Sequence, residues 1–300
     1  MKKLLFLSTA AVLIFASSFA EKKKLTKKTA LKTLNGFCNY VPSGNAVISG
    51  DTLSVQSFYM SSTEITNFQY SEFLYSLKRS GDLDKLAIAE VDSMKWNTTF
   101  KHADMKPMAE FYLSHPAYKE YPVVNISKEA AELFCEWLSD SYDTLSGGEL
   151  KLKFRLPTHA EWMRAARGDN HKSVYAWGGH FVRNPEGQFM GNFVANGSEY
   201  IRRNKETDEL EYVHIEYKQS DFISDGAFIT APVKSFWPND FGFYNMNGNV
   251  SELISDGNQS VGGGWRSPGY DVRNESTREF KGAAPTVGFR VVASYLATDK

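Results

Sequence analysis

Cysteine and histidine are the side chains of this 300-residue chain best suited to bind a soft metal ion or to act as nucleophiles. The two cysteines, Cys38 and Cys135, are too few for a disulfide-rich scaffold or a multi-cysteine zinc or iron–sulfur site. The histidines form no HxxxH or HxH pair of the kind that ligates zinc, and they lie at positions 102, 115, 159, 171, 180 and 214. The sequence also lacks a P-loop and a GxSxG elbow, so phosphate-binding and serine-hydrolase chemistry have no candidate residues.

The overall composition excludes two broad classes of protein. The 34 Lys+Arg residues balance 35 Asp+Glu residues, and 42% of the chain is hydrophobic. That apolar fraction can fill a core, which excludes general disorder. A net charge of −1 gives no field that would attract a phosphate backbone, so no nucleic-acid partner is expected.

The first twenty residues have the pattern of a secretory signal peptide. Lys2 and Lys3 precede an apolar run at 4–16, and Ser18 and Ala20 are the small residues of a cleavage site. We expect an exported chain (periplasmic, outer-membrane-associated or extracellular) with no transmembrane segment after cleavage; an uncleaved N-terminal anchor is the alternative. Because no cysteine lies near the cleavage site, no lipid anchor is expected.

The segment after the signal is rich in lysine. Residues 21–36 therefore predict a charged, solvated tether. Export also places the chain in an oxidising compartment, where Cys38 and Cys135 could form a disulfide. The apolar neighbours of Cys135, Leu133-Phe134 and Trp137, are instead typical of a buried helix face. Both possibilities stay open.

Residues 37–300 predict one α+β domain rich in irregular loops. The apolar spacing indicates strands at 53–60 and 152–156, and helices capped at Thr66 or Asn67, capped at Ser127, and at 160–167. Residues 80–120 have weak periodicity and predict a long loop or an insertion.

Seven short segments are distinctive in content and order. They are STEITN (62–67), YPVVN (121–125), RLPTHAEW (155–162), YAWGG (175–179), YNMNGNV (244–250), GGGW (262–265) and GFR (288–290). Together they resemble the sulfatase-modifying-factor family, whose founding members are formylglycine-generating enzymes. The resemblance covers about residues 41–292 and implies a loop-rich α+β fold related to the C-type lectin fold, with little regular secondary structure. Arg155, Glu161 and Arg167 are candidates for an ion-pair network that fixes these loops.

The resemblance also indicates where the family's copper site would lie. Its enzymes carry two cysteines, at the second and seventh positions after the tryptophan of the glycine-rich motif, and these thiolates hold the copper ion that activates oxygen. Counted from Trp265, those positions are Ser267 and Val272. Valine cannot bind a metal, and serine is a poor ligand for Cu(I), which prefers thiolate. Since no cysteine follows Cys135, we expect no copper and no copper-dependent oxidation, and we identify no catalytic residue.

Structural calcium, by contrast, is implied by two sets of matching positions. The first set is Asn245, the carbonyls of Gly248 and Val250, and the Glu252 carboxylate. The second set is Asn192, the Phe193 carbonyl, Asp225 and the Ala227 carbonyl. Calcium takes such hard oxygen ligands from side chains and backbone alike. The alternative is that these Asn and Asp side chains only satisfy turn backbone.

Non-enzymatic relatives of this pattern include components of bacterial gliding motility and type IX secretion machinery. The chain resembles them at 58–60, at 115–118 and in the long segment 80–120. We therefore expect a non-catalytic structural or protein-binding component of a bacterial envelope assembly, although a fold alone does not fix a function. The aromatic residues expected to contact a protein partner are Phe100, Tyr112, Tyr118, Tyr200, Tyr212 and Tyr217.

Two other functions stay open from the sequence. One is an enzyme of the same family, formylglycine-generating or another oxidoreductase, that uses a non-standard site. Its polar candidates are Tyr270, Asp271, Arg273 and Glu275. The other is a lectin-like domain that binds a glycan or a small ligand.

Overall fold

The computed structural model describes residues 26–100, 104–194, 201–203, 206, 210–212 and 225–295. The expected signal peptide, residues 1–20, lies outside these ranges. Within them, no helix combines the length and the apolar character needed to cross a membrane.

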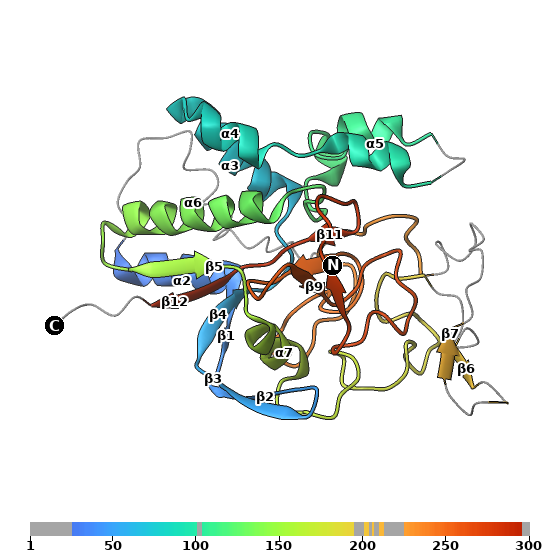
Figure 1. Cartoon of the computed structure of the whole chain (residues 1–300). Helices are drawn as coiled ribbons and strands as arrows, with labels where there is room; N and C mark the ends of the chain where they lie inside the picture. The colour runs from blue at the N-terminus through green and yellow to red at the C-terminus, as the bar shows by residue number, and fades with distance from the viewer. Residues whose placement is uncertain are drawn as a thin grey trace, which may run out of the picture.

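A four-stranded antiparallel sheet lies at the centre, with helices packed on both faces (Figure 1). Phe154 and Ala293 face one side and pack with helix α6, whereas Met60 and Val292 face the other side and pack with helix α7. This division follows from the alternation of side chains along a strand. In sheet order the strands are β1 (Cys38–Val41), β4 (Phe58–Ser61), β12 (Val292–Tyr295) and β5 (Leu152–Arg155), and the two helices are α6 (Lys128–Ser146) and α7 (His159–Arg167).

A second four-stranded sheet carries the C-terminal loops. Its strands are β10 (Thr277–Glu279), β9 (Gln259–Val261), β8 (Ser251–Leu253) and β11 (Val287–Gly288). β11 runs parallel to β8 and pairs Gly288 with Glu252. Two hairpins complete the strands: β2 (Gly44–Ile48) with β3 (Asp51–Val55), and β6 (Ile201–Arg203) with β7 (Leu210–Tyr212).

Helix ends follow the capping residues found in the sequence. Thr66 caps α3 (Asn67–Ser80) in a reciprocal capping box with Gln69, and Ser127 caps α6. Both caps were expected. The expected strand at 53–60 is in fact two strands, β3 and β4, because residues 51–55 pair with β2 and residues 58–61 pair with β1.

The loop before α7 is fixed by an ion pair that the sequence indicated. Arg155 donates to both carboxylate oxygens of Glu161, at 2.7 and 2.6 Å, while Glu161 also accepts from the backbone N–H of Thr158 at 2.9 Å. Arg167 does not join this pair; it binds Glu275 at 2.7 Å instead. Two separate ion pairs therefore replace the single network that was expected.

The expected tether is partly wrong. Helix α2 (Lys27–Phe37) begins after the Thr26 cap, and Ala30 and Leu34 on it have no exposed surface. Ala30, Leu34 and Phe37 are spaced four and three residues apart, so they share one helix face. Leu34 and Phe37 pack in the same core as α6. The lysines occupy the exposed face, which is why composition alone indicated a solvated segment.

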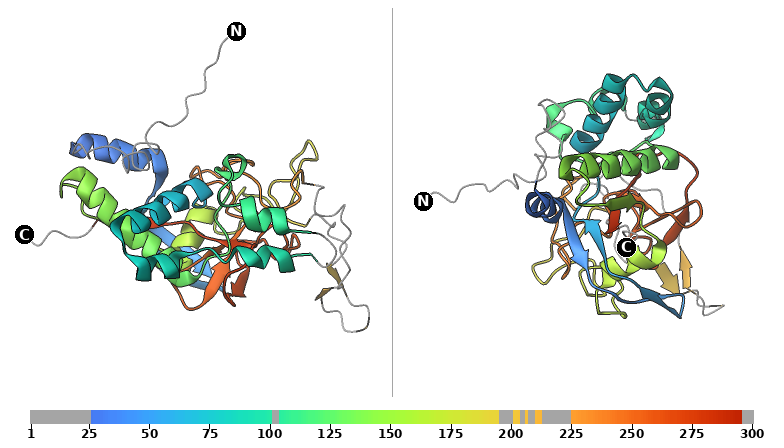
Figure 2. Two further views of the ribbon diagram at one scale, coloured as in Figure 1. Left: turned by 90° about the horizontal axis from the view of Figure 1, so that it is seen from above. Right: turned by 90° about the vertical axis from the view of Figure 1, so that its left-hand side faces the viewer.

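The segment 80–120 is also more regular than expected. It forms two short α-helices and two 3₁₀-helices: α4 (Leu83–Ala89), η1 (Ser93–Thr98), α5 (Lys106–Phe111) and η2 (Pro116–Tyr118). With α3 they build a helical layer over α6, on the side away from the central sheet (Figures 1 and 2). The elements are short, so they carry little periodicity in the sequence.

The two cysteines are free and buried in one core cluster. Burial raises the pKa of both the Cys38 and the Cys135 thiol. The structure therefore contains them as thiols without a disulfide between them.

Candidate functional site

The loop that contains the YNMNGNV motif has a backbone that few residue types can adopt. Asn245 and Asn249 have φ angles of 51° and 60°, and Gly248 has a φ of 88°. Asparagine and glycine tolerate this left-handed region better than other residues. A Cβ atom at Gly248 would also lie 2.5 Å from the carbonyl oxygen of Asn192. Glycine therefore lets the loop pack its backbone directly against Asn192.

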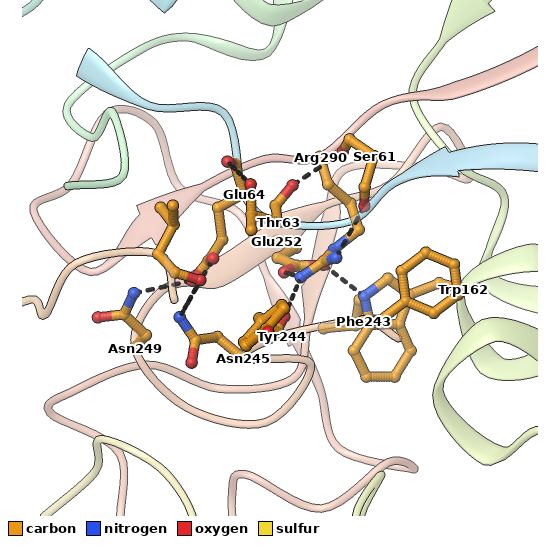
Figure 3. Close-up of polar contacts among 12 residues, drawn as sticks. Ser61, Thr63, Glu64, Trp162, Phe243, Tyr244, Asn245, Asn249, Glu252 and Arg290 are labelled. Carbon is orange, nitrogen blue, oxygen red and sulfur yellow. Dashed lines mark hydrogen bonds and ion pairs between the residues drawn. The ribbon is translucent and has the colours of Figure 1, made fainter. Parts of the chain in front are cut away.

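A buried ion pair between Glu252 and Arg290 lies at the end of this loop (Figure 3). Arg290 donates to the two carboxylate oxygens at 2.6 and 2.5 Å, and neither side chain has exposed surface. The indole Nε1 of Trp162 donates to the same carboxylate at 2.6 Å. Arg290 also donates to the carbonyl oxygens of Ser61 and Tyr244, at 3.1 and 2.9 Å. A buried charge pair is tolerated only with such additional hydrogen bonds.

A second buried carboxylate, Glu64, lies beside this pair and forms no ion pair of its own with a described residue (Figure 3). The side-chain amide groups of Asn249 and Asn245 donate to its two oxygens, at 2.8 and 3.3 Å. Burial raises the pKa of Glu64 to about 8; Arg290 lowers it and the neighbouring Glu252 raises it. Glu64 is therefore mostly protonated at neutral pH, which lets a carboxyl group occupy the core without a cation.

The first calcium set is only partly available to a cation. The Oδ1 atom of Asn245 is buried and accepts no hydrogen bond from the described residues, so this oxygen fits a cation ligand. The Glu252 carboxylate is already neutralised by Arg290 and bonded to Trp162. Glu64, rather than Glu252, is the carboxylate in direct contact with Asn245.

The residues of the second calcium set lie together. The Asp225 carboxylate accepts hydrogen bonds from the backbone N–H groups of Phe193 at 2.8 Å and Ala227 at 3.1 Å. The Asn192 side chain donates to Asn249 Oδ1 at 3.1 Å, which connects the two sets. Burial raises the pKa of Asp225 to about 6, against the lowering effect of its backbone hydrogen bonds. The same bonds would also serve a carboxylate that only stabilises a turn.

Any metal at these positions would depend on carbonyl and amide oxygens. In the part of the chain that the structure describes, no three His, Cys, Asp or Glu side chains come together as a possible metal site.

The two positions expected to match the family's copper ligands, Ser267 and Val272, have structural contacts. The Ser267 hydroxyl accepts a hydrogen bond from the Gly264 backbone at 3.1 Å. Val272 has no exposed surface and packs in an apolar cluster with Tyr175, Phe189 and Phe193. Neither position presents a donor that suits Cu(I).

The polar candidates for a non-standard catalytic site each have a structural partner. Asp271 pairs with Arg278, and Glu275 pairs with Arg167 at 2.7 Å. The Arg273 guanidinium lies 3.5 Å from the centroid of the Tyr270 ring, and its Nε donates to the Tyr270 carbonyl at 2.9 Å. These residues are brought together along one loop, but their charged groups serve contacts within the protein.

The expected partner-contacting aromatics differ in their exposure. Tyr112 is only 3% exposed and belongs to the core, so the expectation is wrong for this residue. Its OH donates to the Pro122 carbonyl at 2.7 Å, which is why the ring turns inward. Phe100 and Tyr118 are half-buried. Tyr200, Tyr217 and the side chain of Tyr212 lie outside what the structure describes.

Sequence analysis included Glu64 and Arg290 in motifs but did not assign them to a site. Glu64 stands between Thr63 and Ile65, and Arg290 stands between Phe289 and Val291. A single charge within such an uncharged run is the available signal for a buried charged or protonated group. Their partners come from distant segments, which the sequence does not reveal.

Replacing Arg290 with leucine is expected to lower the free energy of unfolding by about 3–5 kcal/mol, because it leaves the buried Glu252 without a cation. Urea denaturation at pH 7 measures the loss. The matched control is Arg278→Leu, which removes a more exposed pair with Asp271 and should cost less than about 1 kcal/mol. Similar losses in the two variants would contradict the assigned role of the buried pair.

The raised pKa of Glu64 predicts a stability that falls as the pH rises. Its pKa of about 8 lies above the ordinary value of 4.5, so between these values the folded state holds a proton that the unfolded state has lost. The contribution of Glu64 then declines by up to about 1.4 kcal/mol per pH unit over that range. Glu64→Gln should flatten the slope in EDTA-containing urea titrations, and Glu129→Gln on the exposed face of α6 should not. An unchanged slope in Glu64→Gln would refute the prediction.

The family model of the sulfatase-modifying factor enzyme 1-like domain matches residues 17–295. The chain is 26% identical over 223 residues to the inactive C-alpha-formylglycine-generating enzyme 2 of Bos taurus, covering 74% of this chain and 57% of that protein. It is 25% identical over 235 residues to the formylglycine-generating enzyme of Streptomyces coelicolor, covering 73% of this chain and 61% of that enzyme. The chain thus spans less than two thirds of the length of either relative.

The solved structure of PvdO from Pseudomonas aeruginosa has a similar fold. It aligns with a TM-score of 0.52 and 18% identity, over 85% of this chain and 93% of that chain. At this identity the likeness concerns the fold, and it confirms the expected loop-rich mixture of helices and strands. Because the family model covers nearly the whole chain and the fold agrees, the chain belongs to the sulfatase-modifying factor enzyme 1-like domain family.

Proposed function

We propose that this chain is an exported, non-catalytic member of its family that acts as a structural or protein-binding component of a bacterial envelope assembly. The observation that carries the proposal is the pair Ser267 and Val272 at the positions where the family's enzymes hold copper. The family's oxidation needs two soft sulfur donors that bind one metal ion. The hydroxyl of Ser267 and the isopropyl group of Val272 supply neither.

The surroundings of these positions support the loss of the copper site. The Val272 side chain is closed off from solvent by aromatic rings, and a Cβ atom at the neighbouring Gly263 would lie 2.7 Å from Val272 Cγ1. The position is thus packed as part of the core. Cys38 and Cys135 cannot replace the missing donors, because both are buried in the cluster around α6 and their raised pKa values suppress the thiolate.

The relatives give this proposal a precedent. One of them, from Bos taurus, is itself named as an inactive formylglycine-generating enzyme. The scaffold is therefore compatible with loss of the oxidation activity. In this chain it would serve as a stable framework that presents loops and short helices on its surface.

The proposed place of action rests on the sequence pattern. The expected signal peptide at 1–20 supports export, and the segments 58–60 and 115–118 resemble gliding-motility and type IX secretion components. The helical layer formed by residues 83–118 gives such a component an additional surface beyond the central fold. No lipid anchor is proposed, since no cysteine lies near the expected cleavage site at 18–20.

Purified full-length protein loaded with Cu(I) is expected to convert no cysteine in a sulfatase-type peptide to formylglycine under oxygen, as measured by mass spectrometry. The Streptomyces enzyme serves as the positive control. Affinity purification of the same protein from its native envelope should retain a protein partner in near-stoichiometric amount. Formylglycine formation, or recovery of the chain alone, would contradict the proposal.

We also propose structural calcium at the two connected sets. Asn245, the carbonyls of Gly248 and Val250, and the Glu252 carboxylate or its neighbour Glu64 would hold one ion. The group around Asp225 would hold the other. Calcium accepts few carboxylates when carbonyl oxygens complete its shell. Bound calcium would connect the loops that contain residues 192, 225 and 245.

Calcium in excess over EDTA is expected to raise the Tm by at least about 3 °C, because it binds only the folded chain. Asp225→Asn keeps the shape of the side chain but removes its charge. This variant should therefore lose most of the Tm increase that comes from the calcium ion bound at Asp225. Differential scanning calorimetry measures the effect, with magnesium as the matched ion. No calcium shift, or an equal shift in Asp225→Asn, would argue against the proposed ligands.

A further inference from the structure

We propose that the groove between α3–α4 and η1–α5 binds an amphipathic helix of a partner protein that presents apolar side chains next to a basic residue. This inference rests on the non-catalytic binding role proposed above and names the surface that performs it.

The groove is a cavity of about 470 Å³ on the helical layer. Its apolar walls are Leu74, Leu86, Val91, Met108, Ala109 and Leu113. This volume lies in the range of ligand pockets, roughly 300–1,000 Å³. All of its lining residues lie between positions 74 and 114, so none comes from the loops that carry Ser267, Val272 or the calcium sets.

Two buried rings form the floor beneath the groove and fix its shape. Trp96 and Tyr112 are 1% and 3% exposed, and their ring centroids are 4.9 Å apart. The Tyr112 OH is anchored to the Pro122 carbonyl at 2.7 Å and lies 2.8 Å from the Thr230 hydroxyl. Because these rings are packed in the core, they hold the apolar walls of the groove in place, and a preordered groove loses little entropy on binding.

The helices around the groove also expose large apolar side chains. Tyr75, Met94 and Phe111 are 41%, 65% and 48% exposed. Tyr75 lines the groove itself, and Met94 and Phe111 each adjoin a lining residue in the sequence. Apolar surface that continues from a groove onto its rim is typical of protein-interaction sites.

The charges of the groove favour a basic partner. Its charged lining residues are Glu90, Glu110 and Lys78, and none of them forms an ion pair with another described residue. Two carboxylates against one ammonium leave an excess negative charge. A helix with apolar residues at i and i+3 or i+4 and an adjacent Lys or Arg would fill the groove and pair with these carboxylates.

Selection of displayed helical peptides of roughly four turns on the immobilised full-length protein tests the inference. Enriched peptides should carry the apolar spacing and a basic residue. Ala109→Trp, which fills the groove from α5, should weaken them at least tenfold in fluorescence anisotropy. Ala87→Trp adds the same ring on the exposed face of α4, outside the groove, and should leave their affinity within twofold.

Charge reversal provides a second, independent variant on the surface. Glu90→Lys with Glu110→Lys should weaken the same peptides at least tenfold, whereas Glu129→Lys on α6 should not. The inference is overturned if no peptide is enriched, or if peptide binding is unaffected in both groove variants. It is also overturned if acidic peptides are preferred, or if a fatty acid binds in the groove and no peptide does. Formylglycine formation would instead refute the non-catalytic role and leave these peptide measurements interpretable.

Discussion

The buried pair of Glu252 and Arg290 is the contact on which the arrangement of this fold depends most. Through the hydrogen bonds of these two side chains it joins β8, the segment before β12, the end of β4 at Ser61, and α7 at Trp162. These elements are far apart in the sequence, and β8 belongs to a different sheet from β4 and β12. In a chain with much irregular backbone, a charged pair with several fixed partners supplies the geometric definition that long helices and strands supply elsewhere. Such a pair is costly to break, whatever its net contribution to stability.

The same interior holds a carboxyl group without a cation. Glu64 stays in the core because Asn245 and Asn249 donate to it and because its raised pKa keeps it mostly neutral. The left-handed backbone at both asparagines aims their side chains at it. The STEITN and YNMNGNV motifs thus form a hydrogen-bonded interior that includes neither Ser267 nor Val272.

This separation explains how the scaffold can serve another purpose. Val272 packs in an apolar cluster of its own, apart from the buried polar network of Glu252, Arg290 and Glu64. The proposed docking surface lies elsewhere, in the helical layer that α3 and residues 83–118 form over α6 (Figure 2).

The sequence by itself determined the family, the fold class, the helix caps at Thr66 and Ser127, and the absence of thiolates at 267 and 272, because these depend on local patterns and on residue identity. Only the tertiary structure decided which carboxylate Arg290 neutralises and which one stays protonated, since those pairings join residues far apart in the chain. It also decided that residues 27–37 are a packed helix, because burial of Leu34 requires the face of α6 against which it lies. Composition reports the charge of such a segment, whereas the contact that orders it comes from another part of the fold.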